Sequence, residues 1–307
     1  MGTSIFLAAP IAYTFCGVMW AELSGVYVFG IEGIMLLSAI ASFLGTVATN
    51  NIIIGIVLGV MTAGALGLLT AYLEEVLSAN QVIFAIALLI LGPSLSSYIY
   101  TSYITLNSLS AFQTTINTLP ALPVPLLSEI PFLGQFFNQS ALVYLMYAAV
   151  IGTNYYFYHT KQGLRVRAVG MDPMAADTQG INVRRTRVIA VTMAGILAGF
   201  GGMIMILGQS GFWINNVTAG RGFLAIALVR VGNWRTTVTF AATFAVGFLF
   251  AISSYLQQYF AGVGGTTFPF EVFNDLPYVF AIAIIAISYK WTRSNQPTSL
   301  GIPYHRE

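Results

Sequence analysis

The sequence predicts an all-α, polytopic membrane bundle, because of its composition and its long apolar runs. Hydrophobic residues make up 57% of the chain, charged residues only 7%, and the mean hydropathy is +0.80. These values do not fit an ordinary soluble surface. Uncharged runs at 52–72, 82–103 and 188–209 each match the ~20 residues with which a helix crosses ~30 Å of hydrocarbon. No series of ~10-residue segments of alternating polarity recurs, as a transmembrane barrel would require.

The basic residues predict the orientation of this bundle. All twelve Lys and Arg residues come after position 160, and half of them lie in one polar stretch, 161–187. Basic residues near the ends of spans stay on the cytoplasmic side of a membrane. We therefore expect a cytoplasmic loop at 159–187.

The hydrophobic pattern divides the chain into roughly eight to ten spans within a single transmembrane domain, 1–307. Nine passes are expected at 4–21, 30–49, 52–73, 82–103, 139–158, 187–208, 221–233, 236–258 and 276–290. This topology places the amino terminus and a Pro-rich connection, 104–139, outside the cell membrane, and Glu74, Glu75 and a tail, 290–307, in the cytoplasm. Ten of the twelve basic residues obey the rule; Arg221 and Arg230, at the shortest pass, do not.

Several features point away from export processing and from bound cofactors. The amino terminus, 1–9, carries no Lys or Arg, so we expect no cleaved signal peptide. Cys16 is the only cysteine and is interpreted as an apolar packing residue. His159 and His305 have no neighbouring ligands in the sequence, so we expect no metal and no other cofactor.

Glycines recur within two of the expected spans. Their spacing lets helix backbones approach closely, which predicts a tightly packed bundle. The residues are Gly55, Gly59, Gly64 and Gly67 in one span and Gly195, Gly199, Gly201 and Gly202 in the other.

Two Gly-rich, partly polar stretches, 25–33 and 208–223, interrupt comparable places in the two halves of the chain. Unwound backbone in a membrane is tolerated only where it lines a cavity or is buried by protein, so such pairs indicate a transport pathway. The alternative is an ordinary loop at a helix end. The candidate pathway residues are Glu32, Gln209, Phe212, Trp213, Asn215 and Arg221.

The aromatic and amide side chains of the second stretch suit a neutral ring, such as a nucleoside base or a sugar. Phe212 and Trp213 offer stacking surfaces, and Gln209, Asn215 and Asn216 offer hydrogen bonds. We expect Trp213 and Asn215 to face the outer mouth of the pathway. The alternative is that Trp213 only anchors the chain at the membrane interface.

The basic loop contains the signals of a short capped helix. Asp172 is a typical N-cap, Pro173 suits the first helical position, and Gly180 suits the stop, which predicts a helix at 173–179. The small residues Ala175 and Ala176 permit insertion into a groove on another protein. Against this, any cytoplasmic loop is basic and short capped helices are common.

A longer pattern surrounds this helix, and two further motifs lie one in each half of the chain. The pattern is 163–170, Asp172, Pro173, Ala175, Ala176, 180–183, Ala194, Gly195, Ala198 and Gly199, and the motifs are 30–33 with Met35, and 219–227 with Gly232 and Trp234. The pattern resembles the cytoplasmic coupling region of ATP-binding-cassette importer permeases of the branched-chain amino acid, ribose and nucleoside superfamily. The two motifs resemble the first-half and second-half motifs of its nucleoside and simple-sugar branch.

The resemblance implies a permease subunit that works with a second permease, two ATPase subunits and an extracytoplasmic substrate-binding protein, and with no nucleic acid. It implies coupling to the ATPase through Gly170, Asp172, Pro173, Ala175, Ala176 and Gly180. The chain departs from the usual pattern at Leu23, Ser24, Val28, Arg230 and Thr236. A different partner permease would compensate for these departures, so both a homodimer and a heterodimer are open.

The chain lacks the phosphate-binding loop of an ATPase. That loop ends in Gly-Lys-Ser/Thr, whereas the two lysines here precede Gln162 and Trp291. We therefore expect no enzymatic activity and an external source of energy. The rival hypothesis is a gradient-driven secondary transporter that uses Glu32, since intramembrane acids are functional candidates. A passive channel and a membrane scaffold are the remaining alternatives.

Glu32 and Arg230 are the two charges that this topology leaves at the cytoplasmic ends of membrane segments, one in each half of the chain. One hypothesis is that they form an ion pair. The alternative is that both side chains extend to water, or that Glu32 only stabilises the positive end of the helix it begins.

Overall fold

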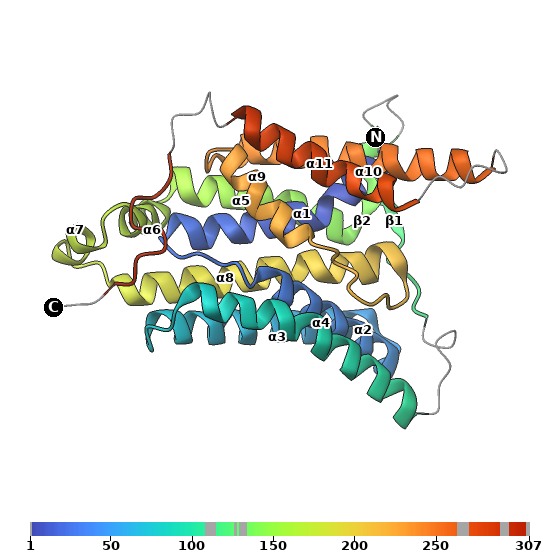
Figure 1. Ribbon diagram of the computed structural model, residues 1–307, viewed down its shortest axis with the longest axis horizontal. Helices are drawn as coiled ribbons and strands as arrows, with labels where there is room; N and C mark the ends of the chain where they lie inside the picture. The colour runs from blue at the N-terminus through green and yellow to red at the C-terminus, as the bar shows by residue number, and fades with distance from the viewer. Residues whose placement is uncertain are drawn as a thin grey trace.

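The computed structural model describes residues 2–107, 115–125, 128, 134–262, 270–288 and 295–304. It confirms an all-α bundle, in which the long helices run roughly along the long axis of the molecule (Figure 1). The described strands are two short ones, β1 (Ala121–Pro123) and β2 (Asn138–Ser140), which pair antiparallel with Ala121 opposite Ser140. His305 and the basic residues 290, 293 and 306 of the predicted tail lie outside the described residues.

Each predicted pass coincides with a helix. These helices are α1 (Gly2–Leu23), α2 (Ile31–Thr49), α3 (Ile52–Glu75), α4 (Gln81–Leu106), α5 (Ala141–His159), α8 (Val183–Met203) with its π-helical continuation η3 (Ile204–Ser210), α9 (Arg221–Val231), α10 (Thr236–Gly262) and α11 (Phe270–Ser288). The other described helices are η2 (Gly134–Phe137), α6 (Lys161–Met171) and α7 (Pro173–Thr178).

Six helices of the described part of the chain are long and apolar enough to cross a membrane: α1, α2, α3, α4, α8 with η3, and α10. The protein is therefore a multi-pass membrane protein. The expected pass at 221–233 is corrected, because α9 has 11 residues and a helix of that length spans only ~16 Å. The helices α5 and α11, of 19 residues each, are not among the six.

Asparagine side chains begin three of the long helices. The Oδ1 atoms of Asn51, Asn80 and Asn182 accept bonds from Ile53 N at 2.9 Å, Val82 N at 3.0 Å and Arg185 N at 2.9 Å, respectively. Each bond satisfies a backbone N–H that has no partner within its own helix. The boundaries of α3, α4 and α8 thus follow directly from the sequence.

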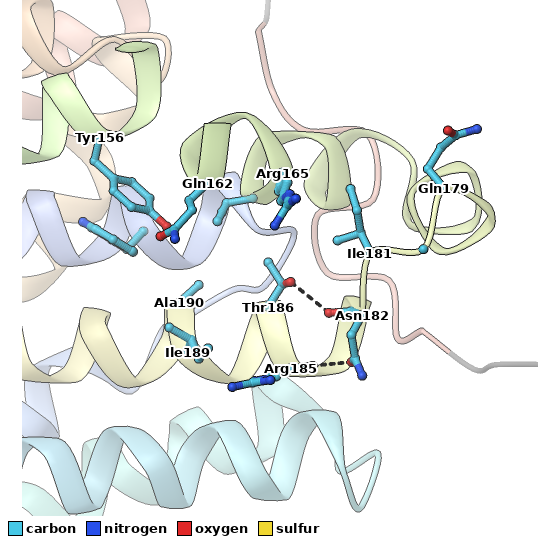
Figure 2. Close-up of a pocket in the computed structure, with 13 residues that line it drawn as sticks. Tyr156, Gln162, Arg165, Gln179, Ile181, Asn182, Arg185, Thr186, Ile189 and Ala190 are labelled. Atoms are coloured by element: carbon cyan, nitrogen blue, oxygen red, sulfur yellow. Dashed lines mark hydrogen bonds between the residues drawn. The ribbon is translucent and has the colours of Figure 1, made fainter. Parts of the chain in front are cut away.

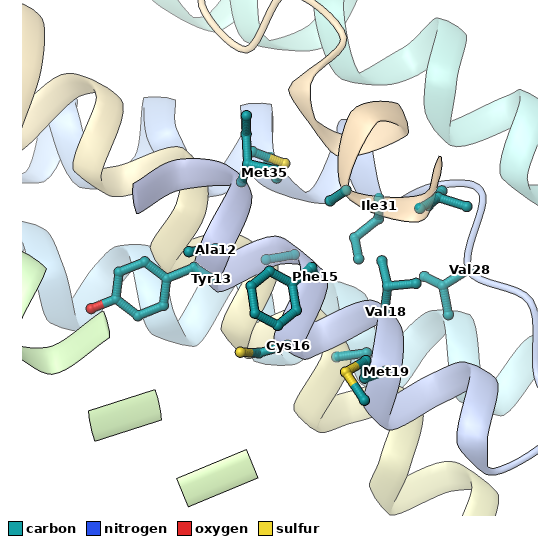
Figure 3. Close-up of a cluster of buried hydrophobic side chains, with 14 of the residues drawn as sticks. Ala12, Tyr13, Phe15, Cys16, Val18, Met19, Val28, Ile31 and Met35 are labelled. Atoms are coloured by element: carbon teal, nitrogen blue, oxygen red, sulfur yellow. The ribbon is translucent and has the colours of Figure 1, made fainter. Parts of the chain in front are cut away.

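Helix α1 lies at the centre of the bundle (Figure 3). Phe15, Cys16 and Met19 on this helix are fully buried, so Cys16 is the apolar packing residue that the sequence predicted. The phenol of Tyr13 donates a hydrogen bond of 2.6 Å to the carbonyl oxygen of Leu142, which joins α1 to the start of α5.

The predicted close approach of helices occurs between α3 and α8. A Cβ atom on Gly195 would lie 2.7 Å from the Cα of Gly67, and a Cβ on Gly67 would lie 3.1 Å from the Cα of Gly195. Larger residues would force the two backbones apart. By contrast, apolar side chains on the outer faces of α3 and α4, such as Ile53, Met61 and Ile83, are exposed, as suits a surface that meets lipid or another membrane subunit.

Candidate functional site

The first interrupted stretch turns back into the bundle. After Leu23 the chain reverses, and residues 24–30 run back beside α1 (Figure 1). In Figure 3 Val28 lies next to Val18 of α1, and both side chains are buried in the same cluster. Helix α2 therefore begins inside the bundle and not at its surface.

The carboxylate of Glu32 joins the two interrupted stretches. Its Oε1 accepts a hydrogen bond of 2.8 Å from Gly220 N, and its Oε2 accepts one of 2.7 Å from Gly222 N. These N–H groups belong to the first turn of α9, where they lack partners in the helix and where the helix dipole favours negative charge. Glu32 thus stabilises the amino end of α9, and it also lies in the first turn of its own helix, α2, as the sequence suggested.

The two ends of α9 contact two different acids. Trp234, just after α9, donates a 2.8 Å bond from Nε1 to Oε2 of Glu22, near the end of α1. With 11 residues, α9 places the contacts of Glu22 and Glu32 up to ~16 Å apart along its axis. Glu32 lies in the first turn of α2, and its expected place at the cytoplasmic side stays a prediction.

The hypothesis of an ion pair between Glu32 and Arg230 is wrong. Arg230 Nη2 lies 3.9 Å from Oε1 of Glu22, and its guanidinium group lies 5.5 Å from the ring centre of Tyr27. Glu22 is buried, with 1% of its surface exposed. Sequence reasoning missed it because the first pass was expected to end at position 21. An acid one residue beyond a pass, in a chain with only ten acidic residues, was the available signal.

In the second interrupted stretch, Gln209 and Arg221 come together. Gln209 donates a 2.7 Å bond to the carbonyl oxygen of Phe6 and accepts a 3.4 Å bond from Nη1 of Arg221. The guanidinium group of Arg221 lies 5.0 Å from the ring centre of Phe250. Its Nε is buried and has no hydrogen-bond partner in the described part of the chain. Arg221 therefore keeps a free donor close to Glu32.

Trp213 does not face an outer mouth, which corrects its expected place. Its side chain is 6% exposed and packs against Phe43 and Tyr100, with ring centres 6.3 and 5.9 Å away. Its Nε1 donates a 3.1 Å bond to Oδ1 of Asn215. The stretch has other, exposed members, and Phe212 has 48% of its surface accessible. The exposed residues are Phe212, Ile214, Asn215, Asn216, Ala219 and Phe223.

The short helix of the basic loop is present. Asp172 Oδ1 accepts a 3.0 Å bond from Ala175 N, and Gly180 has a φ of +78°, so the cap and the stop are confirmed. The two alanines point in different directions. Ala175 is exposed, whereas Ala176 is 4% exposed and packs against Val169 and Val183. Only Ala175, of these two, offers a surface to another protein.

Comparison with known proteins identifies the family. The profile described as "Branched-chain amino acid transport system / permease component" matches residues 1–289. The chain belongs to this permease family. It is 30% identical to a protein of Haloferax volcanii provisionally named a glucose ABC transporter permease, over 95% of this chain and 92% of the relative. No solved structure matches it significantly.

Two bacterial relatives have similar coverage. The permease is 29% identical to a nucleoside ABC transporter permease of Lactococcus lactis, over 92% of this chain and 90% of the relative. It is 30% identical to a guanosine ABC transporter permease of Bacillus subtilis, over 98% and 94% of the two chains. These matches extend along nearly the whole permease.

A cavity of about 650 Å³ opens beside α7, between α6 and α8 of the permease (Figure 2). Arg165 reaches from α6 toward Thr186 of α8 across this space. In Figure 2 Gln179, which follows α7, lies at one end of the cavity and Tyr156 at the other, and Trp20 and Gly180 also line it. The space separates α6 from α8 next to the helix that the sequence assigned to ATPase coupling.

Proposed function

We propose that this permease forms the translocation pathway of an ATP-binding-cassette importer and that its solute is a nucleoside or a simple sugar. The observation that carries the proposal is the contact of Glu32 with the first turn of α9. It brings both interrupted segments to one depth inside the bundle, which is where repeat-built transporters place their binding sites.

The chemistry around this contact favours an uncharged polar solute. The Glu32 carboxylate already accepts two backbone bonds. The amide of Gln209 is already bonded to Phe6 and Arg221, which leaves the Nε donor of Arg221 without a partner among the described residues. This donor suits a hydroxyl or a ring nitrogen, which sugars and nucleosides both carry. The named solutes of the relatives, glucose, nucleosides and guanosine, belong to the same chemical classes.

The partners follow from the same proposal. An ATPase subunit docks on the exposed side of α7, a second permease completes the pathway, and an extracytoplasmic binding protein delivers the solute. The amino terminus lies outside and the carboxyl terminus lies in the cytoplasm, since the basic residues of α6 and of the start of α8 gather at one end of the molecule (Figure 1).

Uptake by cells that express the complete transporter tests the solute class. We expect labelled uridine, guanosine or glucose to accumulate, and an excess of the same unlabelled compound to compete. The matched control is a strain that lacks only this permease. Accumulation of a branched-chain amino acid in place of nucleosides and sugars would overturn the proposed solute.

Docking on α7 predicts the effect of a bulky residue on its outer side. Ala175→Trp enlarges an exposed position, so it should leave the fold intact and reduce solute-stimulated ATP hydrolysis by the complex at least about fivefold, since overpacking costs ~1–3 kcal/mol. The control is Ala141→Trp, at an exposed alanine that begins α5. ATPase recruitment and hydrolysis at normal levels in Ala175→Trp would contradict the docking.

The burial pattern of the second interrupted stretch predicts its labelling. In a Cys16→Ala background, which leaves the chain without cysteine, Phe212→Cys and Asn215→Cys should react with an impermeant thiol reagent added outside. Thr218→Cys, at a fully buried position of the same stretch, should stay unreactive. Reaction of positions 212 and 215 only from the cytoplasmic side would contradict the proposed orientation.

A further inference from the structure

The carboxyl-terminal segment 295–304 is attached to the coupling region and does not extend away from it (Figure 1). Ser299 donates from its backbone N, at 3.1 Å, and from its Oγ, at 2.7 Å, to the carbonyl oxygen of Gly170 at the end of α6. Gly301 N donates a 3.0 Å bond to the carbonyl oxygen of Gly25. The segment lies beyond the family match, which ends at residue 289.

Arg187 of α8 stabilises this attachment with hydrogen bonds. Its side chain is completely buried. Its Nη1 donates to Ile302 O at 3.1 Å, its Nη2 to Ser299 Oγ at 3.3 Å, and its Nε to the carbonyl oxygen of Ser24 at 3.2 Å. The guanidinium group also pairs with Glu75 of α3 at 3.5 Å. A buried guanidinium group is tolerated only when it is paired and hydrogen-bonded, so these partners are held in place.

Gly25 and Gly170 lie where the connected segments pack too closely for a larger side chain. Gly25 has a φ of +93°, and a Cβ there would lie 2.6 Å from Ser299 Oγ and 2.9 Å from Arg187 Nη2. A Cβ on Gly170 would collide with the carbonyl oxygen of Leu23. These close contacts therefore couple the positions of three segments: the end of α6, the start of the fold-back segment and the carboxyl-terminal segment.

We infer that Arg187 and residues 299–302, here called the carboxyl-terminal clasp, position α7 and the end of α6 relative to the fold-back segment 24–30. The inference rests on the proposed function. When an ATPase subunit displaces α7, the clasp passes the displacement through Gly170 to Gly25. The buried residues Val26 and Val28 then pass it along 24–30 to Glu32 and α9. The clasp is a positioning device for transport and does not contact the solute.

The test uses the complete transporter in proteoliposomes and measures solute imported per ATP hydrolysed. Ser299→Ala removes the hydroxyl that joins Gly170 to Arg187 and leaves the backbone bond in place. We expect this ratio to fall by about fivefold or more, the lower range of typical coupling between sites, while complex assembly and thermal unfolding stay close to those of the wild type. Pro303→Ala, at an exposed neighbouring position, is the matched control and should keep the wild-type ratio.

Hydrogen exchange separates positioning from a purely structural role. In the wild-type complex, addition of a non-hydrolysable ATP analogue should change the amide exchange of residues 24–30, and Ser299→Ala should remove that change. If the wild type imports solute with ATP but Ser299→Ala keeps both the ratio and the exchange response, the clasp inference is overturned. If the wild-type complex does not import solute with ATP, the proposed function itself fails.

Discussion

Gly222→Ala is expected to abolish most transport, with a decrease in uptake of at least about tenfold. The added Cβ would lie 2.5 Å from Oε2 of Glu32 and 3.2 Å from its Cα, so the carboxylate must shift from its place at the amino end of α9. Overpacking of a core costs ~1–3 kcal/mol, and the loss of a bond to a charged group costs ~1.5–3 kcal/mol. Uptake of labelled solute at equal permease levels in the membrane measures the effect.

Gly152→Ala is the matched control for this change. A Cβ on Gly152, in α5, meets no other atom within 4 Å, so the variant should transport like the wild type. Glu32→Gln tests the same contact from the other side, because an amide nitrogen cannot accept the bond from Gly220 or Gly222. Wild-type uptake in both Gly222→Ala and Glu32→Gln would show that the contact between the two interrupted segments is dispensable.

Arg187→Met is expected to destabilise the folded permease by about 3–5 kcal/mol, the usual cost of removing one partner of a buried ion pair. The change leaves Glu75, which is 5% exposed, without its cation at the end of α3. It also leaves the carbonyl oxygens of Ser24 and Ile302 without their side-chain donor. The measurement is the thermal unfolding of the purified permease in detergent, together with its yield from the membrane.

Two further variants serve as a control for that result and as a test of the ion pair. Arg184→Met removes an exposed charge of the same helix and should change stability little. The double variant Arg187→Met with Glu75→Gln removes both charges and should be more stable than Arg187→Met alone, since the unpaired carboxylate is gone. An unfolding temperature of Arg187→Met equal to that of Arg184→Met would show that the buried contacts of Arg187 do not stabilise the permease.

The sequence was sufficient for several features that depend on neighbouring residues. Apolar runs predicted most of the long helices to within a few residues, since the length of a span must match the hydrocarbon core. They did not predict α6 or the start of α11 at Phe270. The cap at Asp172 and the stop at Gly180 were predictable because both act on backbone groups three to four residues away. The interruptions at 25–33 and 208–223 were visible as Gly-rich polar breaks.

Features that depend on distant residues were not predictable from the same patterns. Glu32 meets its partners 188 and 190 positions further along the chain, and no periodicity encodes such a pairing. The fold-back of 24–30 places the start of α2 beside the amino end of α9, so Arg230, at the other end of α9, meets Glu22 and not Glu32. For the same reason, only the packed structure shows three further features. They are the buried side of Ala176, the burial of Trp213 and the attachment of the segment 295–304.

The energy source of uptake tests most directly the claim that this chain is an ATP-binding-cassette permease. Cells that make the complete transporter and keep their ATP through glycolysis would be given labelled nucleoside or sugar. They would then be treated with a protonophore or, separately, depleted of ATP with the ion gradients maintained. We predict that uptake survives the protonophore and stops when ATP is depleted. Uptake that the protonophore stops and ATP depletion leaves unchanged would identify a gradient-driven transporter and contradict this account.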